Sequence, residues 1–161
     1  MRYQVQQRVF SLGDRFDIVD EQGQPAFQVK SHLLSIGHSM DLLDSTGAQV
    51  AHIQERVLTF HPEYEISRGG QVVAVVQKKL FTLVHDRFTV EGAAGTFEMV
   101  GDWLSWNYSI TQNGQSVAQI SKQLALFHDR YGVDIAEGVD VPNILCLVIV
   151  MDEVAHPDTE Q

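Results

Sequence analysis

One short pattern recurs along the chain and constrains the fold more than any other feature. Residues 70–90 read GQVVAVVQKKLFTLVHDRFTV, and residues 114–133 read GQSVAQISKQLALFHDRYGV. Two fainter copies begin earlier, GQPAFQVKSHLLSIGH at Gly23 and GAQVAHIQERVLTFH at Gly47. The gap between the last two copies leaves room for one divergent unit, which residues 91–108 fill without the pattern. Such a unit is too short for two helices and a turn, so a smaller element must repeat.

The apolar residues of each copy follow a period of two, which is typical of a β-strand with one buried face. Three even distances from the glycine are apolar in all copies: four residues on stand Phe27, Ala51, Ala74 and Ala118, six on Val29, Ile53, Val76 and Ile120, and ten on Leu33, Val57, Leu80 and Leu124. Each glycine belongs to a turn cluster, where it supplies positive φ at no steric cost. Another alternating segment precedes each turn. Each unit therefore predicts a β-hairpin, and five or six units give about ten to twelve strands.

The apolar run Ile144–Met151 contrasts with these alternating segments because it is apolar on every side. Asp140 suits a helix N-cap and Pro142 suits the first turn. A strand is the alternative, since Ile and Val favour strands, but the capping pattern favours a helix. A helix that is apolar all round must be surrounded, and about ten strands tend to close on themselves. The sequence therefore predicts a mainly β fold, a closed antiparallel barrel around a buried C-terminal helix.

Five segments in this order resemble the LURP-one-related (YxjI-like) family of the tubby C-terminal-like group. They are FSLGDRFDIVDEQGQPAFQVK, L-x-S-[IL]-x-H at residues 33–38, the repeated H-D-R-[FY], VGDWLSWNYSI and ILCLVIVMDEV. The resemblance implies a barrel of about twelve strands around a central hydrophobic helix. It extends over nearly the whole chain, so we expect one domain at residues 1–154 and an acidic tail at residues 155–161. It also implies binding of anionic lipid head groups through basic residues on the barrel surface, as in tubby relatives.

The charge distribution limits the partners that the chain can have. The formal net charge is −10, and residues 131–161 contain seven acids but no Lys or Arg. A general nucleic-acid binder has a basic face and a high pI, so we expect no nucleic-acid partner. The longest apolar run is too short to span a bilayer and the N-terminus lacks a signal peptide. Together with the lone Cys146, which we expect to be buried and inert, this favours a cytoplasmic protein, peripheral to membranes at most.

Basic residues that stand in register in the repeats are the candidate ligand-binding site, because Lys and Arg pair strongly with phosphate oxygens. The residues predicted to bind phosphate or lipid head groups are Lys78, Lys79, Arg87, Lys122 and Arg130; Lys30 and Arg56 share the pattern. The alternative is that these side chains lie on solvated strand faces and pair with acids. Lys78 and Lys122 have the parity of the core face, so either a bulge turns them outward or they snorkel at the barrel mouth.

The sequence contains no recognised catalytic motif, so we expect a non-enzymatic binding or scaffold protein without catalytic residues, metal or cofactor. The alternative is a small metal-dependent hydrolase that uses the His-Asp pairs His85/Asp86 and His128/Asp129 at strand ends. Recurrence of His-Asp-Arg favours a structural role. The aromatic residues Trp103, Trp106 and Tyr108 are expected in the core, although an exposed Trp pair would indicate a protein partner. The physiological ligand and the oligomeric state stay open.

Overall fold

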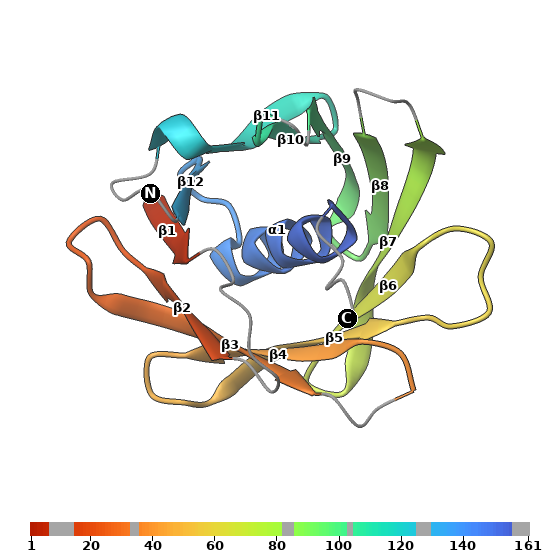
Figure 1. Cartoon of the computed structure of the whole chain (residues 1–161), viewed down its shortest axis with the longest axis horizontal. Coiled ribbons are helices and arrows are strands. Elements are labelled where there is room, and N and C mark those ends of the chain that lie inside the picture. Colours follow the sequence, from red (N-terminus) through yellow and green to blue (C-terminus); the bar gives the residue numbers. More distant parts are fainter. Residues whose placement is uncertain (7–14, 33–35, 82–85, 103–104, 125–129, 156–161) are drawn as a thin grey trace.

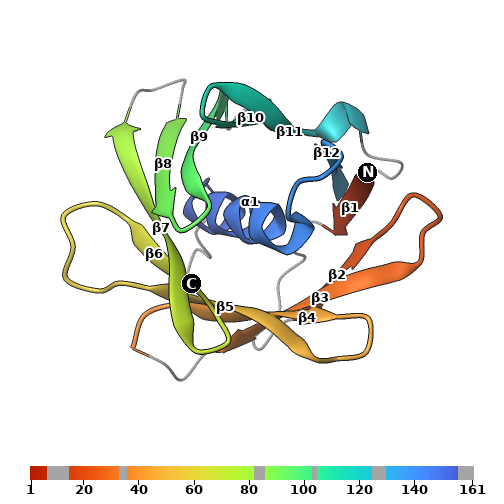
Figure 2. The same ribbon diagram turned by 180° about the vertical axis from the view of Figure 1, so that it is seen from behind.

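The computed structural model describes residues 1–6, 15–32, 36–81, 86–102, 105–124 and 130–155. Within these residues twelve antiparallel strands close into a barrel, and a helix lies inside the ring (Figure 1; Figure 2 gives the view from behind). Each strand pairs with its neighbours in sequence, and β1 closes the ring on β12. The strands are β1 (Arg2–Gln6), β2 (Arg15–Val19), β3 (Pro25–His32), β4 (Ser39–Asp44), β5 (Gln49–Glu55), β6 (Glu63–Arg68), β7 (Gln71–Phe81), β8 (Asp86–Gly92), β9 (Gly95–Asp102), β10 (Asn107–Gln112), β11 (Gln115–Ser121) and β12 (Arg130–Ile135).

The predicted mainly β barrel around a buried C-terminal helix is confirmed. The helix α1 (Val141–Ala155) contains the whole apolar run, and a short 3₁₀ helix, η1 (Lys122–Leu124), follows β11. Asp140 caps α1: its Oδ1 accepts the backbone N–H of Asn143 at 3.3 Å, and its carbonyl accepts that of Ile144 at 3.2 Å. Residues 143–153 of the helix are buried on every side, as an apolar rod inside a ring of apolar strand faces requires.

The strands run alternately up and down, so their connections fall at two ends of the barrel. The turn end carries the connections β2–β3, β4–β5, β6–β7, β8–β9 and β10–β11. The loop end carries the other strand connections. The helix α1 begins at the turn end, where Arg68 Nη1 donates to Asp140 Oδ2 at 2.6 Å. It ends at the loop end, where Glu153 contacts His38 of the β3–β4 connection.

A β-bulge explains the sequence repeat in more detail. In each of the four hairpins that begin a copy, the strand pairing shifts by one residue beside the turn. The unpaired residue stands three after the glycine in every case: Ala26, Val50, Val73 and Val117. The divergent hairpin β8–β9 instead pairs residue by residue from Asp86 opposite Gly101 to Gly92 opposite Gly95. The repeated pattern is therefore the signature of a bulged turn, and the unit without the bulge lacks the pattern.

The even offsets predict the core face correctly near the turns but not beyond the strand end. The residues four and six after the glycines are buried, apart from the half-buried Phe27. Val57, ten after its glycine, is 46% exposed because β5 ends at Glu55 and the chain turns outward there. The expected boundary between the domain and an acidic tail stays a prediction, since α1 ends at Ala155 and residues 156–161 lie outside the described ones.

Candidate functional site at the loop end

Two of the predicted basic side chains lie close together on adjacent strands. Lys78 of β7 pairs with Phe88 of β8, and the next pair is Leu80 with Arg87, so Lys79 is the extra residue of a β-bulge. The side chains of Lys79 and Arg87 are exposed. Neither forms an ion pair with another residue that the structure describes. The bulge therefore places two cationic side chains side by side on the outer surface near the loop end.

Lys78 points the other way, toward the inside of the barrel. The sequence had left open whether a bulge turns this side chain outward. Its side chain is 8% exposed, on the inner side of the barrel wall. Its Nζ lies 5.8 Å from the centroid of the Phe88 ring, a distance at which a cation is attracted to an aromatic face. The bulge falls one residue later, at Lys79, and so leaves Lys78 facing inward. Lys78 therefore does not share a surface with Lys79 and Arg87.

Lys122 lies on a different part of the rim and is tied to the helix through aromatic rings. It begins η1, and its exposed side chain places Nζ 5.3 Å from the centroid of Trp106. Trp106 stacks on Tyr131 with ring centroids 5.0 Å apart, and the hydroxyl of Tyr131 donates to Asp152 Oδ2 at 3.4 Å. Trp106 and Tyr108 are buried, as expected for core aromatics, whereas Trp103 lies outside the described residues. The alternative of an exposed Trp pair is wrong for Trp106.

The remaining basic residues do not complete a single patch. β11 stands three strand positions from β8 in the ring, about 14 Å at the usual strand spacing. The backbone of Arg130 pairs with Gln6 at the start of β12, but its side chain is not described. Arg56, which shares the repeat pattern, contacts Glu63 and donates to Glu65 at 2.6 Å. Arg56 therefore pairs with acids, as the alternative predicted, and of the five predicted residues the two that the structure brings together are Lys79 and Arg87.

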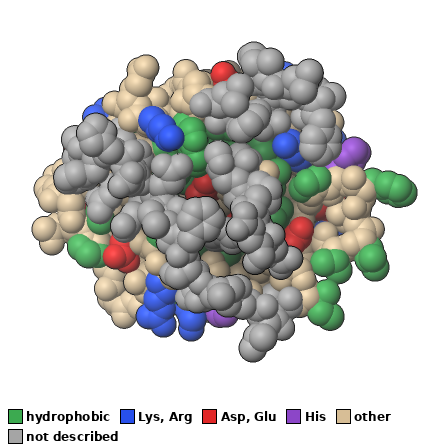
Figure 3. Space-filling model, in the orientation of Figure 1, with side chains coloured by type: hydrophobic (Ala, Val, Ile, Leu, Met, Phe, Trp, Pro, Cys, Tyr) green, Lys and Arg blue, Asp and Glu red, His purple; other side chains and the backbone are tan. Residues whose placement is uncertain are grey.

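An apolar rim, which the sequence analysis did not single out, occupies the same end of the barrel. It consists of Ile36, Val57, Leu58 and Phe60, with relative exposures of 84%, 46%, 102% and 103%. Figure 3, in the orientation of Figure 1, has hydrophobic side chains along its right-hand edge, where the β5–β6 connection lies. Gln54 Nε2, near the end of β5, donates to the carbonyl of Ile36 at 3.2 Å. A Cβ added to Gly37 would lie 3.0 Å from Val57 Cγ1, so the β3–β4 and β5–β6 connections lie against each other. The signal for this rim in the sequence was the apolar segment VLTF at residues 57–60, but the alignment of the repeats assigned it to a strand.

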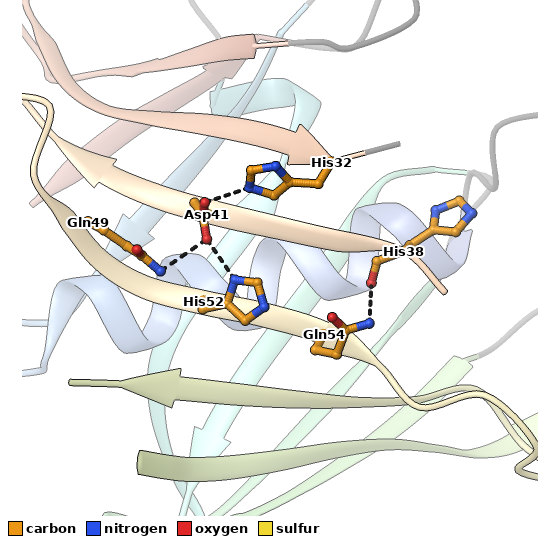
Figure 4. A network of polar contacts seen from close by, with 6 residues as sticks. All are labelled: His32, His38, Asp41, Gln49, His52 and Gln54. Carbon is orange, nitrogen blue, oxygen red and sulfur yellow. Dashed lines mark hydrogen bonds and ion pairs between the residues drawn. The ribbon is translucent and has the colours of Figure 1, made fainter. Parts of the chain in front are cut away.

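A second unpredicted feature lies on the outer wall, where Asp41 of β4 stands between two histidines (Figure 4). His32 Nε2 of β3 lies 2.6 Å from Asp41 Oδ2, and His52 Nδ1 of β5 lies 2.6 Å from Asp41 Oδ1. Gln49 Nε2 also donates to Oδ1 at 3.1 Å. Burial by itself would raise the pKa of the Asp41 carboxyl, but the hydrogen bonds from His52 and His32 outweigh it and hold that pKa below its ordinary value. The cluster links three neighbouring strands by side-chain hydrogen bonds.

The alternative of a metal-dependent hydrolase rests on residues that lie mostly outside the described part of the chain. His85, His128 and Asp129 are not described, nor is the side chain of Asp86. Among the described residues, no group of three or more His, Cys, Asp and Glu side chains has an arrangement that could hold a metal ion. The predicted His-Asp pairs thus lie outside what the structure describes, and the hydrolase stays an alternative prediction.

Two further predictions concern the helix. Cys146 is fully buried in α1, and desolvation raises the pKa of its thiol to about 12, so the reactive thiolate is scarce at neutral pH. The described residues contain no helix with the length and apolar content that crossing a bilayer requires.

The chain is similar to one protein family, to a bacterial protein and to a solved plant structure. The profile of the LURP-one-related family matches residues 1–152. The uncharacterised protein YxjI of Bacillus subtilis (strain 168) is 31% identical over 157 residues, which span 98% of this chain and 95% of that protein. A protein of Arabidopsis thaliana with a known X-ray structure superposes with a TM-score of 0.69 at 19% identity, covering 95% of this chain and 91% of the other. The latter similarity establishes a shared fold.

Proposed function

The chain belongs to the LURP-one-related family, and we propose that it is a non-enzymatic binding protein that holds phosphate groups at the loop end of its barrel. The ligand chemistry is a phosphate, whether on an anionic lipid head group or on a phosphorylated soluble molecule. The observation that carries the proposal is the adjacent, exposed pair Lys79 and Arg87. Both cations project from neighbouring strands without an ion-pair partner among the described residues.

The geometry of this pair suits a phosphate better than a structural role. Arg offers a planar fork of N–H donors and Lys a mobile point charge, and together they can contact different oxygens of one phosphate. Arg56 makes the contrast clear, because its charge is neutralised by Glu63 and Glu65. A bulge that turns one additional Lys outward beside an exposed Arg concentrates positive charge on a chain whose net charge is −10.

The non-enzymatic part of the proposal rests on the same architecture. The helix α1 occupies the barrel interior, the position that in open barrels holds small ligands. The buried Cys146 thiol, with its raised pKa, is a poor nucleophile. We further propose that the protein acts in the cytoplasm, at the surface of membranes, because a single buried thiol suits a reducing compartment.

Vesicle flotation with phosphoinositide-containing and neutral phosphatidylcholine vesicles tests the lipid source of the phosphate, and titration with soluble inositol trisphosphate tests the soluble source. Lys79→Gln and Arg87→Gln should each weaken binding about fivefold, since a Lys or Arg near an anionic surface contributes about 1 kcal/mol. Binding should also fall as the salt concentration rises.

Arg2→Gln is the matched control, because it removes one charge from β1 near the turn end, where Arg2 Nη2 lies 3.6 Å from Asp134. It should leave binding unchanged. If the wild-type protein ignores both phosphate sources, or if all three variants bind alike, the proposed function is wrong.

A further inference from the structure

The apolar rim of Ile36, Val57, Leu58 and Phe60 is unusual in its degree of exposure. Leu58 and Phe60 are 102% and 103% exposed, so their side chains contact almost nothing of the protein. Isolated exposed apolar residues are common on proteins. Here two large ones stand in a single connection and a third, Ile36, lies on the connection beside it. Contiguous apolar side chains of this kind mark a binding surface.

Three hydrogen bonds hold the base of the rim together. The Arg56 N–H donates to the carbonyl of Glu63 at 2.8 Å. The hydroxyl of Thr59 lies within 3.2 Å of the Arg56 carbonyl and 2.7 Å of the His61 carbonyl. Only Thr59 interrupts the apolar side chains at the tip, and its hydroxyl is thus directed back into the loop.

Leu58 has a strained backbone conformation although its side chain is fully exposed. Its φ is +68°, in the left-handed region that costs a non-glycine residue free energy. A Leu held there while fully exposed contributes nothing to the core of the protein. In this conformation the apolar side chain of Leu58 points away from the barrel. Contact with a partner would account for the strain, since strained residues are retained at functional sites.

Positively charged side chains lie next to the apolar rim, as binding to an anionic membrane surface requires. The carbonyl of Pro62, at the end of the β5–β6 connection, accepts the backbone N–H of Lys78 at 3.1 Å. This bond joins the connection to β7 one residue before the bulge that exposes Lys79, beside Arg87. The acids nearest the rim are engaged: Glu63 and Glu65 by Arg56, and Glu55 by the backbone N–H of His38 at 2.9 Å.

We propose that the apolar rim inserts into the interface of an anionic bilayer while Lys79 and Arg87 bind the head groups beside it. This inference rests on the proposed function and assigns its ligand to a membrane. The two signals are complementary, since neither a small apolar anchor nor a few charges alone gives stable attachment. The rim side chains enter the acyl boundary and release ordered water, while the cations stay at the depth of the phosphates.

A dye attached to the rim tests insertion directly. Phe60→Cys supplies one accessible thiol, because the thiol of Cys146 is buried and its pKa is raised to about 12. An environment-sensitive fluorophore on residue 60 should shift its emission to the blue when vesicles of phosphatidylcholine and phosphatidylserine are added. The control is Val72→Cys with the same dye. Val72 is 53% exposed near the turn end, and its dye should not shift.

Substitution completes the experiment. Leu58→Ser and Phe60→Ser should each weaken binding to the anionic vesicles about tenfold by flotation, whereas the matched Val72→Ser should not. Binding of soluble inositol trisphosphate should be unchanged in all three variants. Circular dichroism confirms that each variant is folded, which is expected for side chains that contact almost nothing.

The outcomes separate this inference from the proposed function. If the protein floats with anionic vesicles, depends on Lys79 and Arg87, and yet shows no shift at residue 60, insertion is wrong and phosphate binding stands. If soluble inositol trisphosphate binds but no vesicle does, the membrane assignment is likewise wrong. A dimer in sedimentation velocity that Phe60→Ser converts to a monomer, without any vesicle binding, would assign the rim to a second copy of the chain and overturn the proposal.

Discussion

The two ends of the barrel are made from the same strands, but they differ in what their connections contribute. At the turn end, glycines with positive φ and aspartate side chains close short hairpins: Asp20 Oδ1 accepts the N–H groups of Gln22 and Gln24, each at 2.9 Å. At the loop end, Leu58 and Phe60 are fully exposed, and Asp152 and Glu153 are buried near the end of α1.

If the loop end has the function proposed above, this difference separates stability from function. The turn end pairs its polar groups locally and recurs in sequence, which is typical of segments that fix strand register. The loop end places apolar groups in water and carboxylates in the interior, choices that cost stability and are retained where a surface has a function. The comparison predicts that substitutions at the turn end reduce stability without affecting binding, and that some at the loop end do the reverse.

The largest effect is expected for Gly47→Val at the turn end. The φ of Gly47 is +85° and no atom lies within 4 Å of an added Cβ, so backbone strain alone is measured. A β-branched residue in this region should lower the free energy of unfolding by about 2 kcal/mol, measured by urea denaturation. Gly47→Asn, which tolerates the left-handed region, should lose less than half as much. Equal losses for the two variants would argue against strain as the cause.

The next effect concerns the helix start, also at the turn end. Asp140→Ala removes the N-cap of α1 and the partner of Arg68, and should lower the free energy of unfolding by about 1 kcal/mol. Asp140→Asn keeps the cap but not the ion pair, so it should lose only a few tenths of a kcal/mol. Vesicle binding should be the same for both variants and the wild type. A loss of binding in Asp140→Ala would contradict the functional separation of the two ends.

A smaller effect of opposite sign is expected at the loop end. Leu58→Asn replaces a strained Leu by a residue that tolerates positive φ, and should raise the free energy of unfolding by about 0.5 kcal/mol. The same variant should bind anionic vesicles more weakly, because an apolar side chain is lost. Phe60→Asn should leave stability almost unchanged, since Phe60 is fully exposed. If Leu58→Asn destabilises the protein, then Leu58 has a packing role that its exposure does not reveal.

The smallest effect is lost in acid and concerns the wall between the two ends. The pKa of Asp41 is lower in the folded protein than in the unfolded chain, so this carboxylate stabilises the fold above the unfolded pKa of about 3.9. That contribution is lost as the pH falls through the lower pKa of the folded state. Asp41→Asn should therefore be less stable than the wild type at pH 7 and equally stable near pH 2. Thermal unfolding across this range measures the difference; a constant difference would exclude the titration of Asp41 as its source.

The local features were predictable because each depends on residues close in sequence. The hairpins follow from glycine turns and alternation, and α1 follows from Asp140, Pro142 and a run too apolar for a one-sided element. The positions of the basic side chains were predictable only in part. Lys78 and Lys79 are adjacent in sequence, yet the bulge directs one inward and the other outward. The period of two predicts which face of a strand a residue occupies, but it does not predict where a β-bulge shifts the alternation.

The amino-acid sequence by itself determined the hairpins and the apolar C-terminal helix, because turn chemistry, capping and hydrophobic period act within a few residues. The tertiary structure alone decided that His32, Asp41 and His52 meet across three strands, that Lys79 and Arg87 share a surface, and that the β5–β6 connection projects its apolar side chains outward. Those neighbours are set by register between strands and by closure of the ring. Both depend on packing over the whole barrel and leave no local pattern in the chain.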